Sequence, residues 1–349
     1  MGTIWFWLVA IMIVIYVLLD GFDLGAGAIH LFVAKTDDER RQVLASIGPV
    51  WDGNEVWLVA AGGTLYFAFP VLYASAFSGF YLPLMIVLWL LILRGASIEF
   101  RNHIKSAVWD PLWDFLFCAS SLLLAVFFGA ALGNVVRGVP LDASGYFFEP
   151  LWTNFRLGDE TGILDWYTIL VGVLALLALV MHGGLWVRLK TRGAVGERAC
   201  RLASKTWWLV TALTGLVTAL TFQIQPQVKE NFTTRPWAFV FPMLAMAGLA
   251  GVRWFMARGD ERRTFFASCA YLAGMLTSVV FGVYPMVLPA RNPAYSLTVT
   301  TAKAADYGLK IGLAWWILGI ILAAGYSAYV YRSFAGKVVV DKDAHGYGD

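Results

Sequence analysis

The sequence predicts an all-α integral membrane protein, and three observations lead to this fold class. Hydrophobic residues make up 59% of the 349 residues and charged residues only 14%, whereas a soluble domain has about 45–50% and about 25%. Charge-free apolar runs recur along the whole chain, and a membrane-spanning helix needs about 20 such residues. The 24 Phe, 16 Trp and 14 Tyr exclude intrinsic disorder. A net charge of only +3 argues against a nucleic-acid-binding protein.

The apolar runs, taken in chain order, predict nine transmembrane helices in a single membrane domain, residues 1–334. The runs are Met1–Leu19, Val56–Leu93, Phe115–Val136, Trp166–Val187, Thr206–Val228, Pro236–Val252, Thr264–Ala290 and Ile311–Tyr331. The second run is too long for one crossing. Phe69-Pro70 and Ser78-Gly79 interrupt it, so we expect two helices joined by a tight turn. The nine spans are expected at about 3–33, 50–70, 73–95, 112–136, 163–188, 205–225, 236–256, 264–289 and 308–332, and residues 335–349 as a short cytoplasmic tail.

The loop charges predict the orientation of these spans. With nine crossings the connecting segments alternate sides, and 19 of the 26 Lys and Arg residues fall on one side. The positive-inside rule assigns that side to the cytoplasm. We therefore expect the N-terminus outside and the C-terminus inside. Eight crossings, the alternative, would place the C-terminal tail outside.

Acidic residues interrupt the inner half of the first span. Charged residues at membrane depth are costly, at about 2.5–3.5 kcal/mol for a central Asp or Arg, and therefore informative. Asp20 and Asp23 are three residues apart and share one helix face. Gly21 and Gly25 allow another helix to approach closely. Such a carboxylate pair can relay protons, bind a cation or hold a partner arginine; the alternative is a structural cap or ion pair near the inner surface.

A second acidic pair opens the next span from the inner side. Asp52 and Glu55 share one face near the positive N-terminus of the expected helix. The four acids suggest a proton uptake path or a polar interface with another subunit, and the alternative is a hydrated helix start. Three neighbouring residues are structural or ion-pair candidates: Trp51, Asn54 and Trp57. The two tryptophans could anchor the helix at the membrane interface or line a dry pocket.

Basic residues near the inner end of the third span are further candidates for ion pairs. Arg94 is placed to neutralise one of the acids, or alternatively it extends to lipid headgroups. Glu99 and Arg101 belong to the same segment and are structural or ion-pair candidates.

The histidines argue against haem ligation by this chain. Only four histidines are present, and His30 and His182 are the two near span ends. A membrane cytochrome with two axial histidines per haem needs facing pairs at depth. The three cysteines match no metal-site spacing, and no His/Cys/Asp/Glu cluster predicts zinc. We therefore expect no metal and no haem ligated here.

Several motifs, in this order, resemble subunit II of the cytochrome bd family of quinol oxidases. The likeness covers essentially the whole chain, is strongest over the first 140 residues, and its most specific part is Trp51-Asp52-Gly53-Asn54. The motifs are Asp20-Gly21-Phe22-Asp23 with Gly25 and Gly27, Asp38-Glu39-Arg40-Arg41, Gly48-Pro49-Val50-Trp51-Asp52-Gly53-Asn54-Glu55-Val56-Trp57-Leu58, Ala76-Phe77-Ser78-Gly79-Phe80-Tyr81, Phe128-Gly129 with Gly133-Asn134, Arg137-Gly138-Val139-Pro140, Tyr284-Pro285 with Pro289, and Tyr295-Ser296-Leu297-Thr298.

The resemblance implies a haem-free subunit of a terminal oxidase in the bacterial cytoplasmic (inner) membrane. The complex would oxidise quinol and reduce dioxygen to water with cytoplasmic protons. Two b-type haems and one d-type haem would lie in a larger subunit I. The present chain would form two four-helix bundles plus one peripheral helix. A structural quinone, membrane lipids and small single-span accessory subunits are further components that the family suggests.

In the family, acids at the positions of Asp20, Asp23 and especially Asp52 lie near a hydrophilic path from the cytoplasm. Glu55 is their neighbour and stands where some relatives have glutamine. A cation- or proton-coupled secondary transporter is the alternative function. Transporters have polar or broken helices near the midplane, whereas the acids here cluster at the inner edge.

Overall fold

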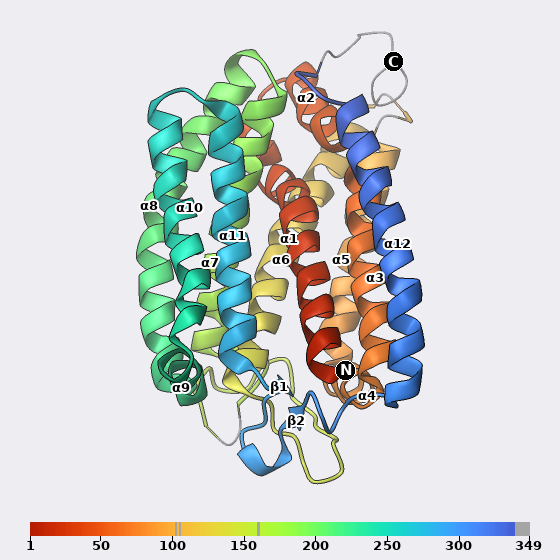
Figure 1. Ribbon diagram of the computed structural model, residues 1–349. Coiled ribbons are helices and arrows are strands. Elements are labelled where there is room, and N and C mark those ends of the chain that lie inside the picture. The colour runs from red at the N-terminus through yellow and green to blue at the C-terminus, as the bar shows by residue number, and fades with distance from the viewer. Residues whose placement is uncertain (102, 105, 159–160, 339–349) are drawn as a thin grey trace.

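The computed structural model describes residues 1–101, 103–104, 106–158 and 161–338, and almost all of its regular structure is helical (Figure 1). Residues 339–349, most of the expected tail, lie outside this description. The helices are α1 (Gly2–Val33), α2 (Asp37–Ile47), α3 (Trp51–Ala68), α4 (Pro70–Gly79), α5 (Tyr81–Phe100), α6 (Trp109–Arg137), α7 (Trp166–Lys190), α8 (Gly193–Ile224), α9 (Pro226–Thr234), α10 (Val240–Ala257), α11 (Glu261–Val283) and α12 (Asp306–Ser333). Short 3-10 helices cover Pro236–Phe239 and Pro293–Tyr295, and two strands are β1 (Met286–Leu288) and β2 (Leu297–Thr298).

Eight helical segments of the described residues are long and apolar enough to cross a membrane. They are α1, α5, α6, α7, α8, Pro236–Ala257 (which includes α10), α11 and α12. The pair α3 and α4 passes the same test only together, with a bend of 120° between them, so the number of crossings is eight or up to nine. These segments establish the membrane-spanning helical class that the composition predicts.

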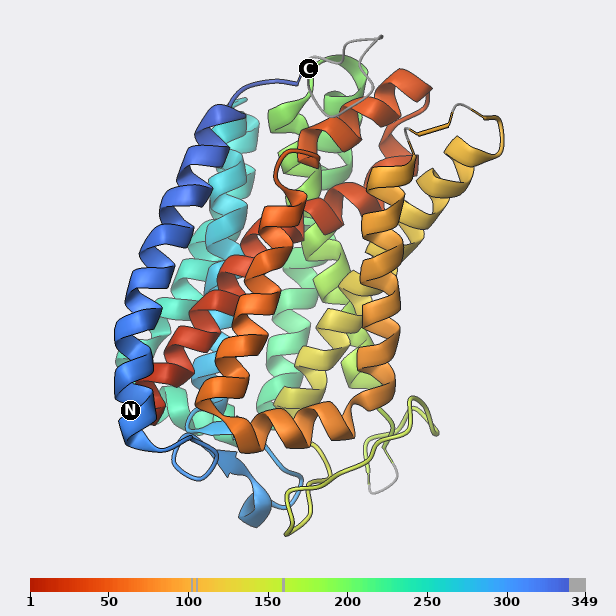
Figure 2. The ribbon, with the colours of Figure 1, turned by 90° about the vertical axis from the view of Figure 1, so that its right-hand side faces the viewer.

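The connection between α3 and α5 differs from the expected tight turn. A ten-residue helix, α4, lies across the ends of α3 and α5 (Figure 2). Pro70 occupies the first turn of α4, where its missing N–H costs no hydrogen bond and its fixed φ suits a helix. The proline that suggested a turn therefore starts a new helix, and α5 begins at Tyr81 rather than near residue 73.

Helix α7 lies at the centre of the packing and contacts α1, α6, α8 and α11 (Figure 1). Helices α3 and α5 pack against α1 and α6, respectively, and α10 packs against α11. Helix α1 crosses α7. At that crossing a Cβ on Gly25 would collide with the carbonyl oxygen of Leu179, and one on Gly183 would collide with the backbone of Ala26. Glycine is thus required for this backbone approach.

The last helix lies at the edge of the molecule beside α3 (Figures 1 and 2). No residue in the apolar window of α12 is buried inside the chain. At one end the indole Nε1 of Trp5 donates to the carbonyl oxygen of Leu309 at 3.2 Å. At the other end the hydroxyl of Tyr331 donates to Asn54 at 2.8 Å. Polar contacts near both ends therefore attach α12 to the rest of the chain.

Candidate functional site

The centre of the candidate site is an ion pair between α1 and α5. Asp20 and Arg94 are both completely buried. Arg94 Nη1 donates to Asp20 Oδ2 at 2.9 Å, and Nη2 donates to Asp20 Oδ1. Such a bidentate guanidinium–carboxylate contact fixes the relative orientation of both groups. The structure therefore places Arg94 against an acid of the first span and not at the lipid headgroups.

Asp23 lies on the same side of α1 and has a neutral partner. Asn54 Nδ2 donates to Asp23 Oδ2 at 2.7 Å, and Asn54 Oδ1 accepts from the hydroxyl of Tyr331. Asp23 is fully buried and Asn54 is 2% exposed. The other carboxyl oxygen, Asp23 Oδ1, has no hydrogen-bond partner among the described residues. This contact chain joins α12, α3 and α1.

The second acidic pair is divided between the buried site and the surface. Glu55 Oε1 lies 3.1 Å from Arg94 Nη2, and the Glu55 side chain is 25% exposed. Asp52 is exposed at the start of α3 and forms no ion pair with another described residue. Glu55 thus connects the Asp20–Arg94 pair with the exposed end of α3, one turn from Asp52. Two carboxyl groups, Asp20 and Glu55, contact the guanidinium of Arg94, and Asp23 interacts with it electrostatically.

The remaining predicted residues have separate positions. Trp57 is buried and packs in a cluster with Met12 and Tyr16. Trp51 is half-buried and lies over Gly95 of α5. Glu99 is exposed near the end of α5 and does not join the buried acids.

Arg101 belongs to a different ion cluster at the α2 end of the molecule. Asp114 accepts from Arg101 Nε at 2.6 Å and from Arg40 Nη1 at 2.9 Å, and its Oδ1 lies 2.7 Å from His30 Nε2. Arg101 Nη2 also lies 2.6 Å from Asp37 Oδ1. Burial raises the pKa of Asp37, but the nearby guanidiniums outweigh this effect and lower it overall. The cluster ties α1, α2, α5 and α6 together and has a structural role.

A comparable cluster fastens the long loop between α6 and α7 at the opposite end. Arg137 contacts Asp165 and lies 2.8 Å from Glu149, which also contacts Arg291. Burial raises the pKa of Glu149, and the two guanidiniums oppose this effect only in part. A backbone bridge pairs Val139 with Ala290. The two long loops at this end are therefore held as one unit.

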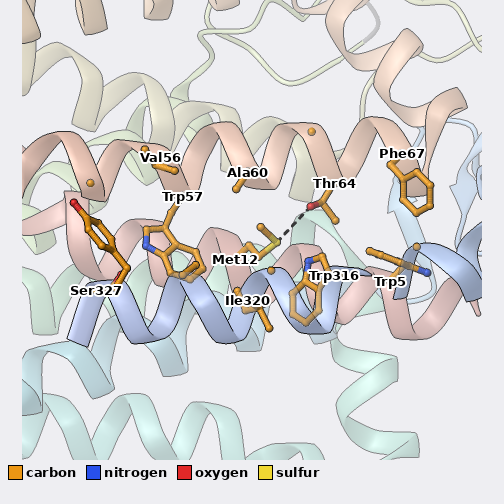
Figure 3. Close-up of a pocket in the computed structure, with 16 residues that line it drawn as sticks. Trp5, Met12, Val56, Trp57, Ala60, Thr64, Phe67, Trp316, Ile320 and Ser327 are labelled. Carbon is orange, nitrogen blue, oxygen red and sulfur yellow. Dashed lines mark hydrogen bonds between the residues drawn. The ribbon is translucent and has the colours of Figure 1, made fainter. Parts of the chain in front are cut away.

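An apolar groove of about 530 Å³ lies between α1, α3 and α12 (Figure 3). Trp5 and Phe67 stand at one end, and Trp57 and Ser327 stand at the other (Figure 3). Most of its lining is apolar, and Thr64 there donates to the sulfur of Met12. The groove has no set of titratable groups for catalysis. The acids lie beyond its end, toward Asn54.

The buried histidines do not fit haem ligation. His182 Nδ1 lies 2.7 Å from the hydroxyl of Ser268, and its Nε2 lies 3.0 Å from the carbonyl oxygen of Leu18. His30 Nε2 is held by Asp114. Both ring nitrogens of His182 and Nε2 of His30 are thus occupied by structural hydrogen bonds, whereas His30 Nδ1 has no partner among the described residues. The two rings therefore do not offer a pair of free axial ligands. Within the described ranges no group of three or more His, Cys, Asp or Glu residues is arranged to hold a metal ion.

Sequence reasoning missed two tyrosines at this site. Tyr331 contacts Asn54 across 277 positions of the chain, and a single tyrosine in an apolar helix gives no signal of such a partner. Tyr16 is 3% exposed and lies one helical turn from Asp20 on the same face of α1. That spacing is a signal that could have found Tyr16.

The fold and the site define a class: a multi-pass helical membrane protein with buried acids near one face. Comparisons with known proteins specify the family. The family model for cytochrome bd terminal oxidase subunit II matches residues 1–334. The probable cytochrome oxidase subunit 2 of Haemophilus influenzae is 30% identical over 98% of this chain and 97% of its own length. The cytochrome bd ubiquinol oxidase subunit 2 of Bacillus subtilis is 32% identical, with coverage of 94% and 95%.

A solved structure supports the fold. A chain in the bd oxidase structure from Geobacillus thermodenitrificans superposes with a TM-score of 0.73 at 17% identity, covering 95% of this chain and 98% of that chain. The present chain belongs to the family of cytochrome bd terminal oxidase subunit II. It is thus a component of a bacterial inner-membrane quinol oxidase complex with a partner subunit I. The comparisons give no support to the transporter alternative.

Proposed function

We propose that this chain supports the haem-bearing subunit I and delivers cytoplasmic protons toward it. In this proposal the complex oxidises quinol and reduces dioxygen to water. Two b-type haems and one d-type haem lie in subunit I. The chain crosses the membrane nine times, with the N-terminus outside, the C-terminus inside, and two four-helix bundles flanked by α12. Lipids, a structural quinone and small single-span subunits are further proposed components of the complex.

One observation carries the proton role: three carboxyl groups share the environment of one guanidinium, two of them in direct contact with it. Asp20 takes both nitrogens of Arg94, Glu55 lies at the edge, and Asp23 has an oxygen without a described partner. Uncompensated charges inside a membrane protein are costly. The surplus carboxyl groups are therefore suited to gain and release protons. Asp52 and then Glu55 would connect them with the cytoplasm along one face of α3.

The test is Asp52→Asn in the purified two-subunit complex. We expect oxygen reduction to fall about tenfold or more, because a positioned proton-transfer group is removed, while haem content stays unchanged. Asp38→Asn is the matched control, since Asp38 is also exposed at the start of a helix, α2. Normal turnover in Asp52→Asn would exclude the proton role of Asp52. Loss of assembly would show that the residue is structural.

A further inference from the structure

The acid site, formed by Asp20, Asp23, Glu55 and Arg94, is connected to α12 through one side-chain amide, that of Asn54. The hydroxyl of Tyr331 is 2.8 Å from Asn54 Oδ1, and Asn54 Nδ2 is 2.7 Å from Asp23 Oδ2. Tyr331 is half-buried, whereas Asn54 and Asp23 are almost inaccessible. A chain of two hydrogen bonds thus connects α12, α3 and α1 and ends at the carboxyl group of Asp23.

The chemistry of the groups fixes the direction of this line. An amide oxygen only accepts, and an amide NH₂ only donates. The tyrosine hydroxyl donates to the oxygen, so the NH₂ group faces the carboxyl group of Asp23. Without the Tyr331 hydroxyl, no described donor on α12 would hold the amide oxygen of Asn54. An ionised Asp23 also selects the NH₂ group, because a carboxylate only accepts. Tyr331 therefore holds this orientation of Asn54 when Asp23 is protonated as well.

The consequence for Asp23 is an asymmetric carboxyl group. Oδ2 is held by Asn54, and Oδ1 is buried with no partner among the described residues. We propose that Tyr331 is a positioning residue for proton transfer: through Asn54 it holds Oδ2, so that Oδ1 gains and releases the proton. This proposal rests on the proposed proton-delivery function. It assigns to the peripheral helix α12 a part in the chemistry of α1.

Titratable groups on each surrounding helix belong to the same environment. Asp20 lies on α1, and Glu55 and Arg94 reach the site from α3 and α5. Cys269 of α11 interacts electrostatically with Tyr331. On α7, His182 is engaged with Ser268 and with the carbonyl oxygen of Leu18. Of these side chains, Tyr331 alone comes from α12, so a change there tests the contribution of that helix.

The experiment compares Tyr331→Phe with Tyr329→Phe in the purified two-subunit complex. Tyr329 is on the same helix and is 70% exposed, so its variant controls for loss of a hydroxyl on α12. We expect Tyr331→Phe to keep full haem content and an unchanged KM for quinol. Its kcat should fall about fivefold, the factor that corresponds to one net hydrogen bond. Tyr329→Phe should match the wild type.

An infrared measurement separates positioning from general structural damage. The carboxyl C=O band that disappears in Asp23→Asn is assigned to Asp23. We expect this band to shift in Tyr331→Phe and to stay in place in Tyr329→Phe. We also expect Tyr331→Phe to add nothing to Asn54→Ala, because both changes break the same line.

Three outcomes would overturn the inference. They are an unmoved band with wild-type kcat in Tyr331→Phe, additive effects of the Tyr331 and Asn54 changes, and failure of Tyr331→Phe to assemble with haem. If Asp23→Asn slows turnover and Tyr331→Phe does not, only the positioning role fails. If Asp23→Asn turns over normally, the proton role of Asp23 in the proposed function fails as well.

Discussion

Breaking the Asp20–Arg94 pair on one side should destabilise the chain far more than neutralising both partners. Both side chains are completely buried. Removing one partner of a buried ion pair costs about 3–5 kcal/mol, because it leaves an uncompensated charge. An ordinary interhelical hydrogen bond in a membrane protein contributes about 0.6 kcal/mol. For Arg94→Met and Asp20→Asn we therefore expect a coupling energy of about 2–4 kcal/mol, with the double variant more stable than Arg94→Met alone.

The assay is a double-mutant cycle on the chain in mixed micelles, with unfolding by SDS read from tryptophan fluorescence. Glu55 does not interfere strongly, because its side chain is 25% exposed and can be hydrated. Arg201→Gln is the control: its pair with Glu197 is 3.8 Å long and exposed, so it should change stability by less than about 1 kcal/mol. A coupling energy near 0.6 kcal/mol would refute the argument, since the pair would then behave as an ordinary hydrogen bond.

Two further predictions concern packing and pH. Gly25→Ala should lower the free energy of unfolding by about 1–3 kcal/mol, because its Cβ would meet the backbone of α7. Gly215→Ala, with open space around it in α8, should be neutral or stabilise by up to about 1 kcal/mol in the same SDS titration. The hydrogen bond from Arg198 lowers the pKa of Glu39 despite partial burial. The stabilisation from Glu39 is therefore complete above the ordinary glutamate pKa and is lost as the pH falls through the lowered value. The protection factors of the α2 amides, which correct for the pH dependence of intrinsic exchange, should fall with acidification in the wild type and depend less on pH in Glu39→Gln; equal pH dependence in both would contradict this assignment.

Much of the fold class followed from local sequence properties. Apolar runs and their length predict membrane helices, and the helix period places Asp20 and Asp23 on one face. An ion pair between Arg94 and one of the acids was one of two interpretations of its position near the end of an apolar run, but the sequence did not indicate which acid. These features depend on neighbours in the sequence or on the cost of burying charge, both of which can be read from one chain.

Features set by tertiary contacts could not be predicted. Pro70 is compatible with a turn and with a helix start, and only the packing of α3 and α5 decides for α4. Asp52 belongs to the most specific motif, yet it is exposed in this chain. Asp114 could be interpreted only as a residue flanking a span, because His30, Arg40 and Arg101 come from three other segments. Such partners are chosen by the three-dimensional arrangement.

The position of Tyr331 has a consequence for the biogenesis of the protein. The residue follows Asn54 by 277 positions, and it lies at the end of the last described helix. During synthesis α1, α3 and α5 emerge early. Asp20 can therefore meet Arg94 before the later helices have been synthesised. The amide of Asn54 receives its donor only after α12 has been inserted. The acid site is therefore assembled in two stages, and its hydrogen bond to α12 forms in the second stage.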